Sequence, residues 1–255
     1  MSRILGIGIV TPLGDDVEAV LSAVREGRSG LSAQPALDGL PDSRAGVVSG
    51  PDLAGWLTRK KDGRLLARAA RLALPAAGRA LRALPPGVAE DTAIYVAVGR
   101  EPPDDPEAEP SLLAMEVDGV LNRERLGGRG RELYPPLLPL RTLPNMVLAH
   151  VSIRHGLRGE NGTFAGAATA GVQAIRAACL AVDEGRAPFA LAGAAFSGVD
   201  LASARDRLRV GLTAPPGEAA VFILVGPGEP LRWDPRDWIA AMGDCGPVAG
   251  LWGLL

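Results

Sequence analysis

The segment from residue 156 to residue 171, GLRGENGTFAGAATAG, has the residue pattern most suited to chemistry. Small residues form an expected strand that leads into Ala168, Thr169 and Gly171, where a helix begins. A helix N-terminus stabilises a thiolate, so an enzyme would place a nucleophile at such a junction. No cysteine or serine stands there. Thr169 has the one hydroxyl group at the junction, and it is equally suited to capping the helix.

Other patterns predict weaker sites. Gly6-Ile7-Gly8 resembles the start of a dinucleotide fingerprint, but these glycines lie inside an expected strand and Thr11 follows where a glycine should stand. Close backbone approach in a crowded sheet is the better explanation for them. Ser29-Gly30 and Ser197-Gly198 lie outside any G-x-S-x-G motif, which favours ordinary turn serines.

The histidines and cysteines are too few for a metal centre. His150 and His155 are five residues apart, so on one helix they would point about 140° away from each other. Cys179 and Cys245 form neither a disulfide framework nor a metal cluster, which fits a reducing compartment. We therefore expect no metal and no cofactor.

Composition excludes several classes of protein. The chain has 255 residues, of which 47% are hydrophobic, and a formal net charge of −2. This is enough apolar material for one large domain or two small ones, and the balance of charge does not favour nucleic acid or acidic membranes. The N-terminus lacks the pattern of a signal peptide, and no run reaches the ~20 apolar residues of a membrane span. We expect a cytoplasmic protein.

One basic cluster stands out against this balance, at Arg59, Lys60, Lys61, Arg64, Arg68 and Arg71. The simpler interpretation is a solvated helix face. The alternative is an electrostatic landing site for an acidic partner, with Arg59, Lys60 and Lys61 in contact with it.

Alternating apolar runs and turn residues predict an α/β fold without repeats or an interdomain linker. Strands are expected over residues 3–11, 93–98, 161–167, 189–195 and 219–225. Helices are expected to begin near residue 17 and to cover residues 62–84, 111–125, 145–155 and 169–184. Pro75 should kink or interrupt the second of these helices.

The junction at Ala168 resembles the nucleophile elbow of the β-ketoacyl synthase family, which has the thiolase fold. The resemblance runs from Pro144-Asn145-Met146 through Gly156-Leu157-Arg158-Gly159 to the GAATAG stretch at 166–171. Residues 6–31, residues 60–72 and the GEAA at 217–220 are also similar to family motifs. The resemblance implies a single domain over residues 1–255, a thiolase-like layered fold whose first half is largely complete and whose second half is mostly missing.

Two departures from the family decide the expected chemistry. Ala168 stands where the family has its acyl-carrying cysteine, so no thioester can form there. Residues 241–255 resemble, with a one-residue gap, a late turn and helix of the second half, and Asp244 then stands where the family has a catalytic histidine. A chance apolar tail explains these residues equally well. The uncharged run VAGLWGLL predicts a buried position.

The resemblance implies a non-catalytic subunit of the chain-length-factor type. Such a subunit pairs with a complete β-ketoacyl-ACP synthase as a heterodimer and shapes its acyl tunnel in polyketide or polyene fatty-acyl biosynthesis. Acyl carrier protein would be reached through that partner. The expected dimer contacts lie in the strand before the junction and at the start of the preceding helix: Asn161, Thr163, Phe164, Ala165, Ala167, Asn145 and Met146. Tunnel-closing side chains are expected on a helix at Met115, Val117, Val120 and Leu121.

Two alternatives stay open. One is a stand-alone decarboxylase or hydrolase with a remodelled site, for which Thr169, His150, Asp244 and Glu218 are the available polar groups. The other is an acyl-binding or scaffold module without a ketosynthase partner. A half thiolase fold should leave one face of its central helix layer uncovered, which favours a permanent partner.

Overall fold

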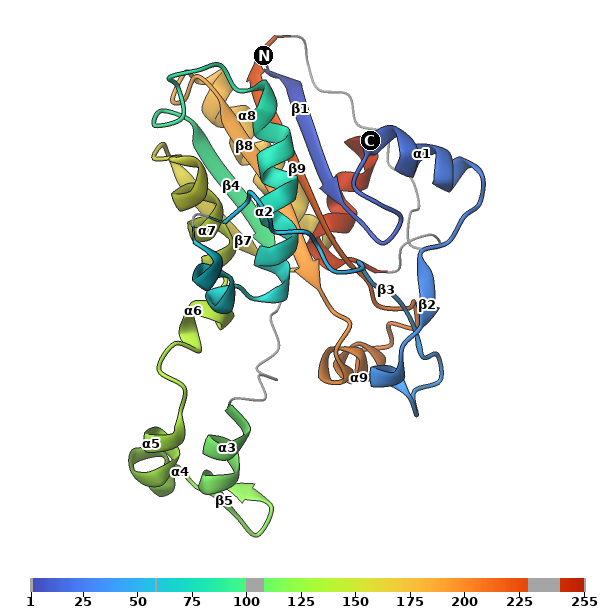
Figure 1. Cartoon of the computed structure of the whole chain (residues 1–255), viewed down its shortest axis with the longest axis vertical. Coiled ribbons are helices and arrows are strands. Elements are labelled where there is room, and N and C mark those ends of the chain that lie inside the picture. Colours follow the sequence, from blue (N-terminus) through green and yellow to red (C-terminus); the bar gives the residue numbers. More distant parts are fainter. Residues whose placement is uncertain (1, 58, 100–107, 229–243, 255) are drawn as a thin grey trace.

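The computed structural model describes residues 2–57, 59–99, 108–228 and 244–254 (Figure 1). A five-stranded sheet forms the centre, in the order β1-β9-β8-β4-β7. Its strands are β1 (Ser2–Val10), β4 (Ala93–Val98), β7 (Asn161–Ala165), β8 (Ala190–Ser197) and β9 (Glu218–Pro227). β4 runs parallel to β7 and β8, and β9 runs antiparallel to its neighbours β8 and β1. The predicted strands are all present, and the fold is α/β as expected.

Helices cover both faces of the sheet (Figure 1). On one face lie α2 (Arg68–Ala80) and α7 (Met146–His155); on the other lie α8 (Ala168–Asp183) and the 3₁₀ helix η6 (Gly246–Leu254). Alternate side chains of β4 point to opposite faces of the sheet. Tyr95 packs with α8, and Ile94 and Val96 pack with α2 and α7. A strand buried on both faces reads as a continuous apolar run, which is why AIYVAV is recognisable in the sequence.

The glycines of β1 serve close packing against α2. A Cβ at Gly8 would lie 1.9 Å from the carbonyl oxygen of Ala76, and one at Gly6 would lie 2.4 Å from that of Ala80. Any side chain would push the helix off the sheet. The prediction of close backbone approach, rather than dinucleotide binding, is confirmed.

The predicted helix over residues 62–84 is broken at a different place. A 3₁₀ helix, η2 (Lys60–Leu65), comes first; α2 then runs unbroken through Pro75 and is followed by the 3₁₀ turn η3 (Leu81–Ala83). The break falls at Leu66 and Ala67, where Arg71 donates to the carbonyl oxygens of Leu66 and Gly63. These side-chain bonds satisfy backbone groups that a continuous helix would have used.

Residues 108–138 form a lobe that lies apart from the sheet, at the lower end of Figure 1. The lobe contains α3 (Glu109–Met115), the hairpin of β5 (Glu116–Val117) and β6 (Val120–Leu121), α4 (Arg123–Arg125), the irregular turn η5 (Leu126–Gly130) and α5 (Arg131–Leu133). The prediction of one continuous helix over residues 111–125 is therefore wrong, because a hairpin over residues 116–121 separates α3 from α4. Asp118 and Gly119 both have positive φ, 52° and 79°, the conformation of a type I′ hairpin turn, which a helix cannot contain.

The remaining elements lie around the sheet. They are α1 (Val17–Arg25), the small sheet of β2 (Leu31–Ala33) and β3 (Arg44–Gly46), the 3₁₀ turn η1 (Pro35–Leu37), α6 (Pro139–Thr142) and α9 (Leu201–Arg209). Among the described residues no helix combines the length and apolar character needed to span a membrane.

Candidate functional site

The junction between β7 and α8 has the expected strand-to-helix geometry. β7 ends at Ala165, the N–H of Gly166 still donates to the carbonyl oxygen of Val98 at 3.0 Å, and α8 begins at Ala168. Ala167 occupies the N-cap position without a side-chain cap bond. The prediction of Thr169 as the cap is wrong, because Thr169 already lies within the first turn.

The chemistry of this junction is limited by Ala168. Ala167, Ala168 and Thr169 are exposed, and the first-turn N–H groups of α8 receive no side-chain acceptor from the N-cap. The partial positive charge of a helix N-terminus would stabilise a thiolate at this position. A methyl group has no lone pair to offer, so Ala168 cannot act as a nucleophile, and the Thr169 hydroxyl is the nearest candidate group in the first turn.

The chain's own C-terminal segment covers α8 one turn beyond the junction. Cys245, Val248 and Leu251 are fully buried, in the same core as Ala170, Ala174 and Ala178 of α8. The prediction that the uncharged tail is buried is confirmed for Val248 and Leu251. The expected uncovered face of the central helix layer is not found at this part of α8, because these apolar side chains occupy it. The descent of residues 241–255 from a second half stays a prediction, and residues 241–243 and 255 lie outside the described residues.

Asp244 fastens that segment rather than facing a substrate. Its Oδ2 accepts from Arg207 Nη1 at 2.7 Å, and its Oδ1 accepts from the N–H of Gly246 at 2.8 Å. Its backbone bonds to Pro215 and Gly217. Both side chains of the ion pair are largely buried, with exposed fractions of 13% for Arg207 and 20% for Asp244. One carboxylate oxygen thus ties the segment to α9 and the other caps its own backbone at Gly246, while the backbone of Asp244 bonds to the residues just before β9.

A buried charge cluster surrounds Glu218, the acidic residue of the GEAA stretch. The Glu218 carboxylate accepts from Arg68 through both oxygens, from Ser197 Oγ at 2.8 Å and from the Val48 N–H at 2.8 Å. Its side chain is 2% exposed. The sequence identifies Glu218 only as an available polar group. Its structural role is signalled by a carboxylate at the start of an otherwise apolar strand, where a buried charge needs partners. These contacts join the start of β9 to the end of β8, to the start of α2 and to the loop at Val48, and Ser197 is a structural serine as expected.

The basic cluster divides into two kinds of residue. Arg68 pairs with Glu218 and Arg71 binds backbone carbonyls, so these two hold the fold together. Arg59 and Lys61 are exposed, and Arg59 pairs with Asp62 at 3.0 Å. Lys60 opens η2, and its side chain lies outside the described part of the structure. Carrier-protein docking at Arg59, Lys60 and Lys61 stays a prediction.

Both histidines lie on α7 and are partly buried. Burial lowers the pKa of His150, which packs against the backbone of Leu65 and Leu140. Burial and the neighbouring Arg154 charge lower the pKa of His155 to about 4. Both imidazoles are therefore neutral at physiological pH, in structural positions. Among the described residues no group of three or more His, Cys, Asp or Glu side chains is arranged to hold a metal ion.

β7 lies at the edge of the sheet, with β4 on one side. Ile94 donates to the carbonyl of Glu160 at 2.9 Å and Gly166 donates to Val98 at 3.0 Å, so the even-numbered residues bond to β4. By alternation, the backbone N–H and C=O groups of Asn161, Thr163 and Ala165 face the open edge. Phe164 instead packs on the core. Asn145 and Met146, at the start of α7, are exposed and partly buried respectively.

The residues predicted to close a tunnel lie in the lobe. Met115 ends α3 and is buried, whereas Val117, Val120 and Leu121 belong to the hairpin. Val120 is 68% exposed and Leu121 is 61% exposed. Further large apolar side chains of the lobe and its connection to α7 are also exposed: Leu112, Leu113, Leu126, Tyr134, Leu137 and Leu143.

Residues 3–222 match the family model described as the N-terminal domain of beta-ketoacyl synthase. The chain is 28% identical over 196 residues to 3-oxoacyl-[acyl-carrier-protein] synthase 2 of Vibrio cholerae, covering 75% of this chain and 44% of that protein. It is 29% identical over 198 residues to the protein of the same name from Vibrio harveyi, with 75% and 44% covered. The chain thus spans less than half the length of these curated relatives.

Solved structures show the same fold. The ishigamide ketosynthase/chain length factor matches 89% of this chain and 62% of its own, with a TM-score of 0.66 and 24% identity. A beta-ketoacyl synthase from Burkholderia phymatum matches 89% of this chain and 59% of its own, with a TM-score of 0.67 and 20% identity. With its residues 3–222 matching the family's N-terminal domain, the chain belongs to the β-ketoacyl synthase family.

Proposed function

We propose that the chain is a non-catalytic subunit of the chain-length-factor type, which pairs with a complete β-ketoacyl-ACP synthase and shapes its acyl tunnel. The observation that carries this proposal is Ala168, at the place where the family's elbow has its cysteine. The product class is a polyketide or polyene fatty-acyl chain. One matching structure contains a ketosynthase/chain length factor, and another a type II polyketide acyl-carrier protein in complex with its ketosynthase.

The open edge of β7 supports a partner strand. Three consecutive outward backbone positions, Asn161, Thr163 and Ala165, offer donors and acceptors that a second strand can take. In a heterodimer the ketosynthase would supply that strand and continue the sheet. Ala167 and the start of α7 at Asn145 and Met146 border the same region in the proposed interface.

The lobe supports a role beyond dimer formation. Soluble proteins usually expose large apolar side chains singly, whereas the lobe exposes several within one short segment. In the proposed complex Val120 and Leu121, on the second strand of the hairpin, enter the partner's acyl tunnel and limit its length. Met115 is buried and anchors α3, so it acts on the tunnel only by positioning the hairpin.

No contact among the described residues favours the alternative of a stand-alone enzyme. Asp244 is bonded to Arg207 and Glu218 to Arg68, so two of its polar candidates serve the fold. Thr169 lies at the junction without a base among its described hydrogen-bond partners.

Co-expression with a complete ketosynthase tests the proposal. The expected result is a stable one-to-one complex in light scattering, with product chain length set by Val120 and Leu121. The variant Leu121→Ala should lengthen the product, and Leu113→Ala, in the same lobe but on α3, serves as the matched control. A chain that stays monomeric beside the ketosynthase and itself turns over malonyl-carrier protein would overturn it.

A further inference from the structure

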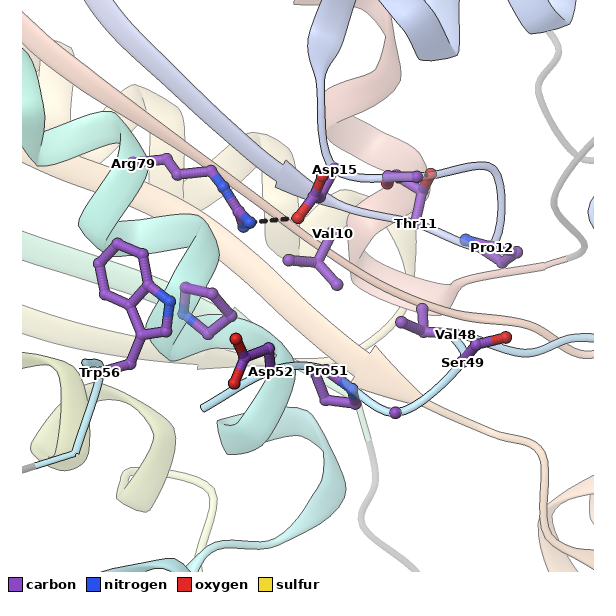
Figure 2. A pocket seen from close by; sticks show the side chains of 13 residues that line it. Val10, Thr11, Pro12, Asp15, Val48, Ser49, Pro51, Asp52, Trp56 and Arg79 are labelled. Carbon is purple, nitrogen blue, oxygen red and sulfur yellow. Dashed lines mark hydrogen bonds and ion pairs between the residues drawn. The ribbon is translucent and has the colours of Figure 1, made fainter. Parts of the chain in front are cut away.

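A cavity of about 420 Å³ lies on the α2 side of the sheet (Figure 2). Its walls come from the end of β1 and the following loop, from the segment Val48–Asp52 after β3, and from Trp56, Pro75 and Arg79. None of its lining residues belongs to β7, α8 or the lobe, so it is separate from the junction at Ala168. Its volume is within the range of sites for small molecules.

The walls are rigid. Pro12, Pro51 and Pro75 contribute rings with few conformations. Trp56 packs directly on α2 at Gly78, where a Cβ would lie 1.9 Å from the indole. The carbonyl oxygens of Gly55 and Trp56 accept from Arg154 at 2.7 Å and 3.0 Å, which fixes the backbone on that side. A ligand would therefore enter a cavity that already exists, with little ordering cost.

The charged side chains of the cavity carry more negative than positive charge. Arg79 is engaged: it pairs with Asp15 and its guanidinium lies 5.9 Å from the centre of the Trp56 ring (Figure 2). Asp52 accepts one N–H from Ala54 at 2.8 Å and has no cationic partner in the part of the chain that the structure describes. Two carboxylates against one guanidinium leave a net negative charge, which repels anions such as carboxylates and phosphates.

We propose that this cavity binds a small organic amine whose ammonium group pairs with Asp52 and whose apolar or aromatic body lies against the prolines and Trp56. The proline rings and the Trp56 indole offer apolar contacts in an otherwise polar lining, beside the Asp52 carboxylate, which has no cationic partner among the described residues. This combination favours a cation attached to a flat apolar group over an anion of the same shape. The ligand class thus differs from acyl thioesters, and the inference stands independently of the proposed subunit role.

Calorimetric titration of the full chain with tryptamine, and with indole-3-propionate as an anion of similar shape, tests the site. We expect millimolar or tighter binding of tryptamine only, and at least about fivefold weaker binding to Asp52→Asn. Asparagine keeps the acceptor for Ala54, so the variant should fold, which circular dichroism checks. Asp38→Asn, an exposed carboxylate outside the cavity, is the matched control and should bind as the unaltered chain does.

Three outcomes would overturn the proposal: no binding of tryptamine at millimolar concentration, equal binding of the anion, or unchanged binding to Asp52→Asn. Titration shifts of the Trp56 indole N–H in NMR spectra add a second readout, since they distinguish binding in the cavity from binding elsewhere.

Discussion

Gly171 of α8 lies directly against Pro247 of the C-terminal segment: a Cβ at position 171 would lie 2.2 Å from the Pro247 carbonyl oxygen and 2.4 Å from Leu251 Cδ1. The absence of a side chain at position 171 therefore allows η6 to pack directly on α8. The helix that begins at Ala168 and the last described element of the chain are packed backbone to backbone.

The variant Gly171→Ala should destabilise the protein, although alanine usually stabilises a helix by about 1 kcal/mol relative to glycine. The added methyl group must displace backbone at Pro247, an overpacking effect that typically costs about 1–3 kcal/mol. Urea unfolding measures the net loss. Gly127→Ala, at a position with open space around it, is the control and should change stability little.

Glu218→Gln should destabilise the protein by about 3 kcal/mol, because Arg68 would then lose its buried charge partner. Chemical denaturation at pH 7 measures the change. The exposed pair of Arg59 and Asp62 is a useful comparison, since Asp62→Asn should cost less than about 1 kcal/mol. Equal costs at the two sites would show that the Glu218 cluster is not a structural centre.

Stability should fall as the pH decreases from about 7 to 5. The pKa of His155 is lowered to about 4, so the unfolded chain takes up a proton at this residue near pH 6.5 while the folded chain does not. The stabilisation is complete above pH 6.5 and is lost as the pH falls toward 4, by up to about 2 kcal/mol at pH 5. Urea titrations across this range should show a shallower slope for His155→Gln, with the remainder due to His150.

Ala168→Cys should introduce a reactive thiol without giving the chain condensation activity. The new thiol would lie at the N-terminus of α8, which lowers a thiol pKa, whereas burial raises the pKa of Cys179 and Cys245. Iodoacetamide should modify position 168 first, as peptide mass spectrometry can follow. Because His150 and His155 lie on α7 in structural positions, condensation of malonyl-carrier protein should stay at background.

Thr163→Pro should weaken the proposed complex with a ketosynthase while leaving the chain folded. The Thr163 N–H faces the open edge of β7, so proline removes a donor from the partner and none from β4. Thr163→Val keeps the N–H and is the matched control. Analytical ultracentrifugation of each mixture gives the dissociation constants, and identical values for both variants would contradict strand pairing at this edge.

The sheet and the elbow could be predicted from the sequence because their signals are local. AIYVAV and residues 219–225 are continuous apolar runs, and the GAATAG stretch places the start of α8 almost to the residue. The lobe could not be predicted in this way, since Met115–Leu121 has apolar spacing that fits a helix and only the Asp118-Gly119 turn contradicts it. The roles of Arg68 and Asp244 depend on partners 150 and 37 residues away in the chain, which no local pattern shows.

The pairing of β1 with β9 has a consequence for how the protein is made. Residues 2–10 find their sheet neighbour at residues 220–227, near the opposite end of the chain. At a translation rate of about 5–20 residues per second, the first strand leaves the ribosome roughly ten seconds or more before its neighbour exists. During that interval its apolar residues depend on α2 or on chaperones for cover, so slow synthesis should expose this protein to aggregation before folding is complete.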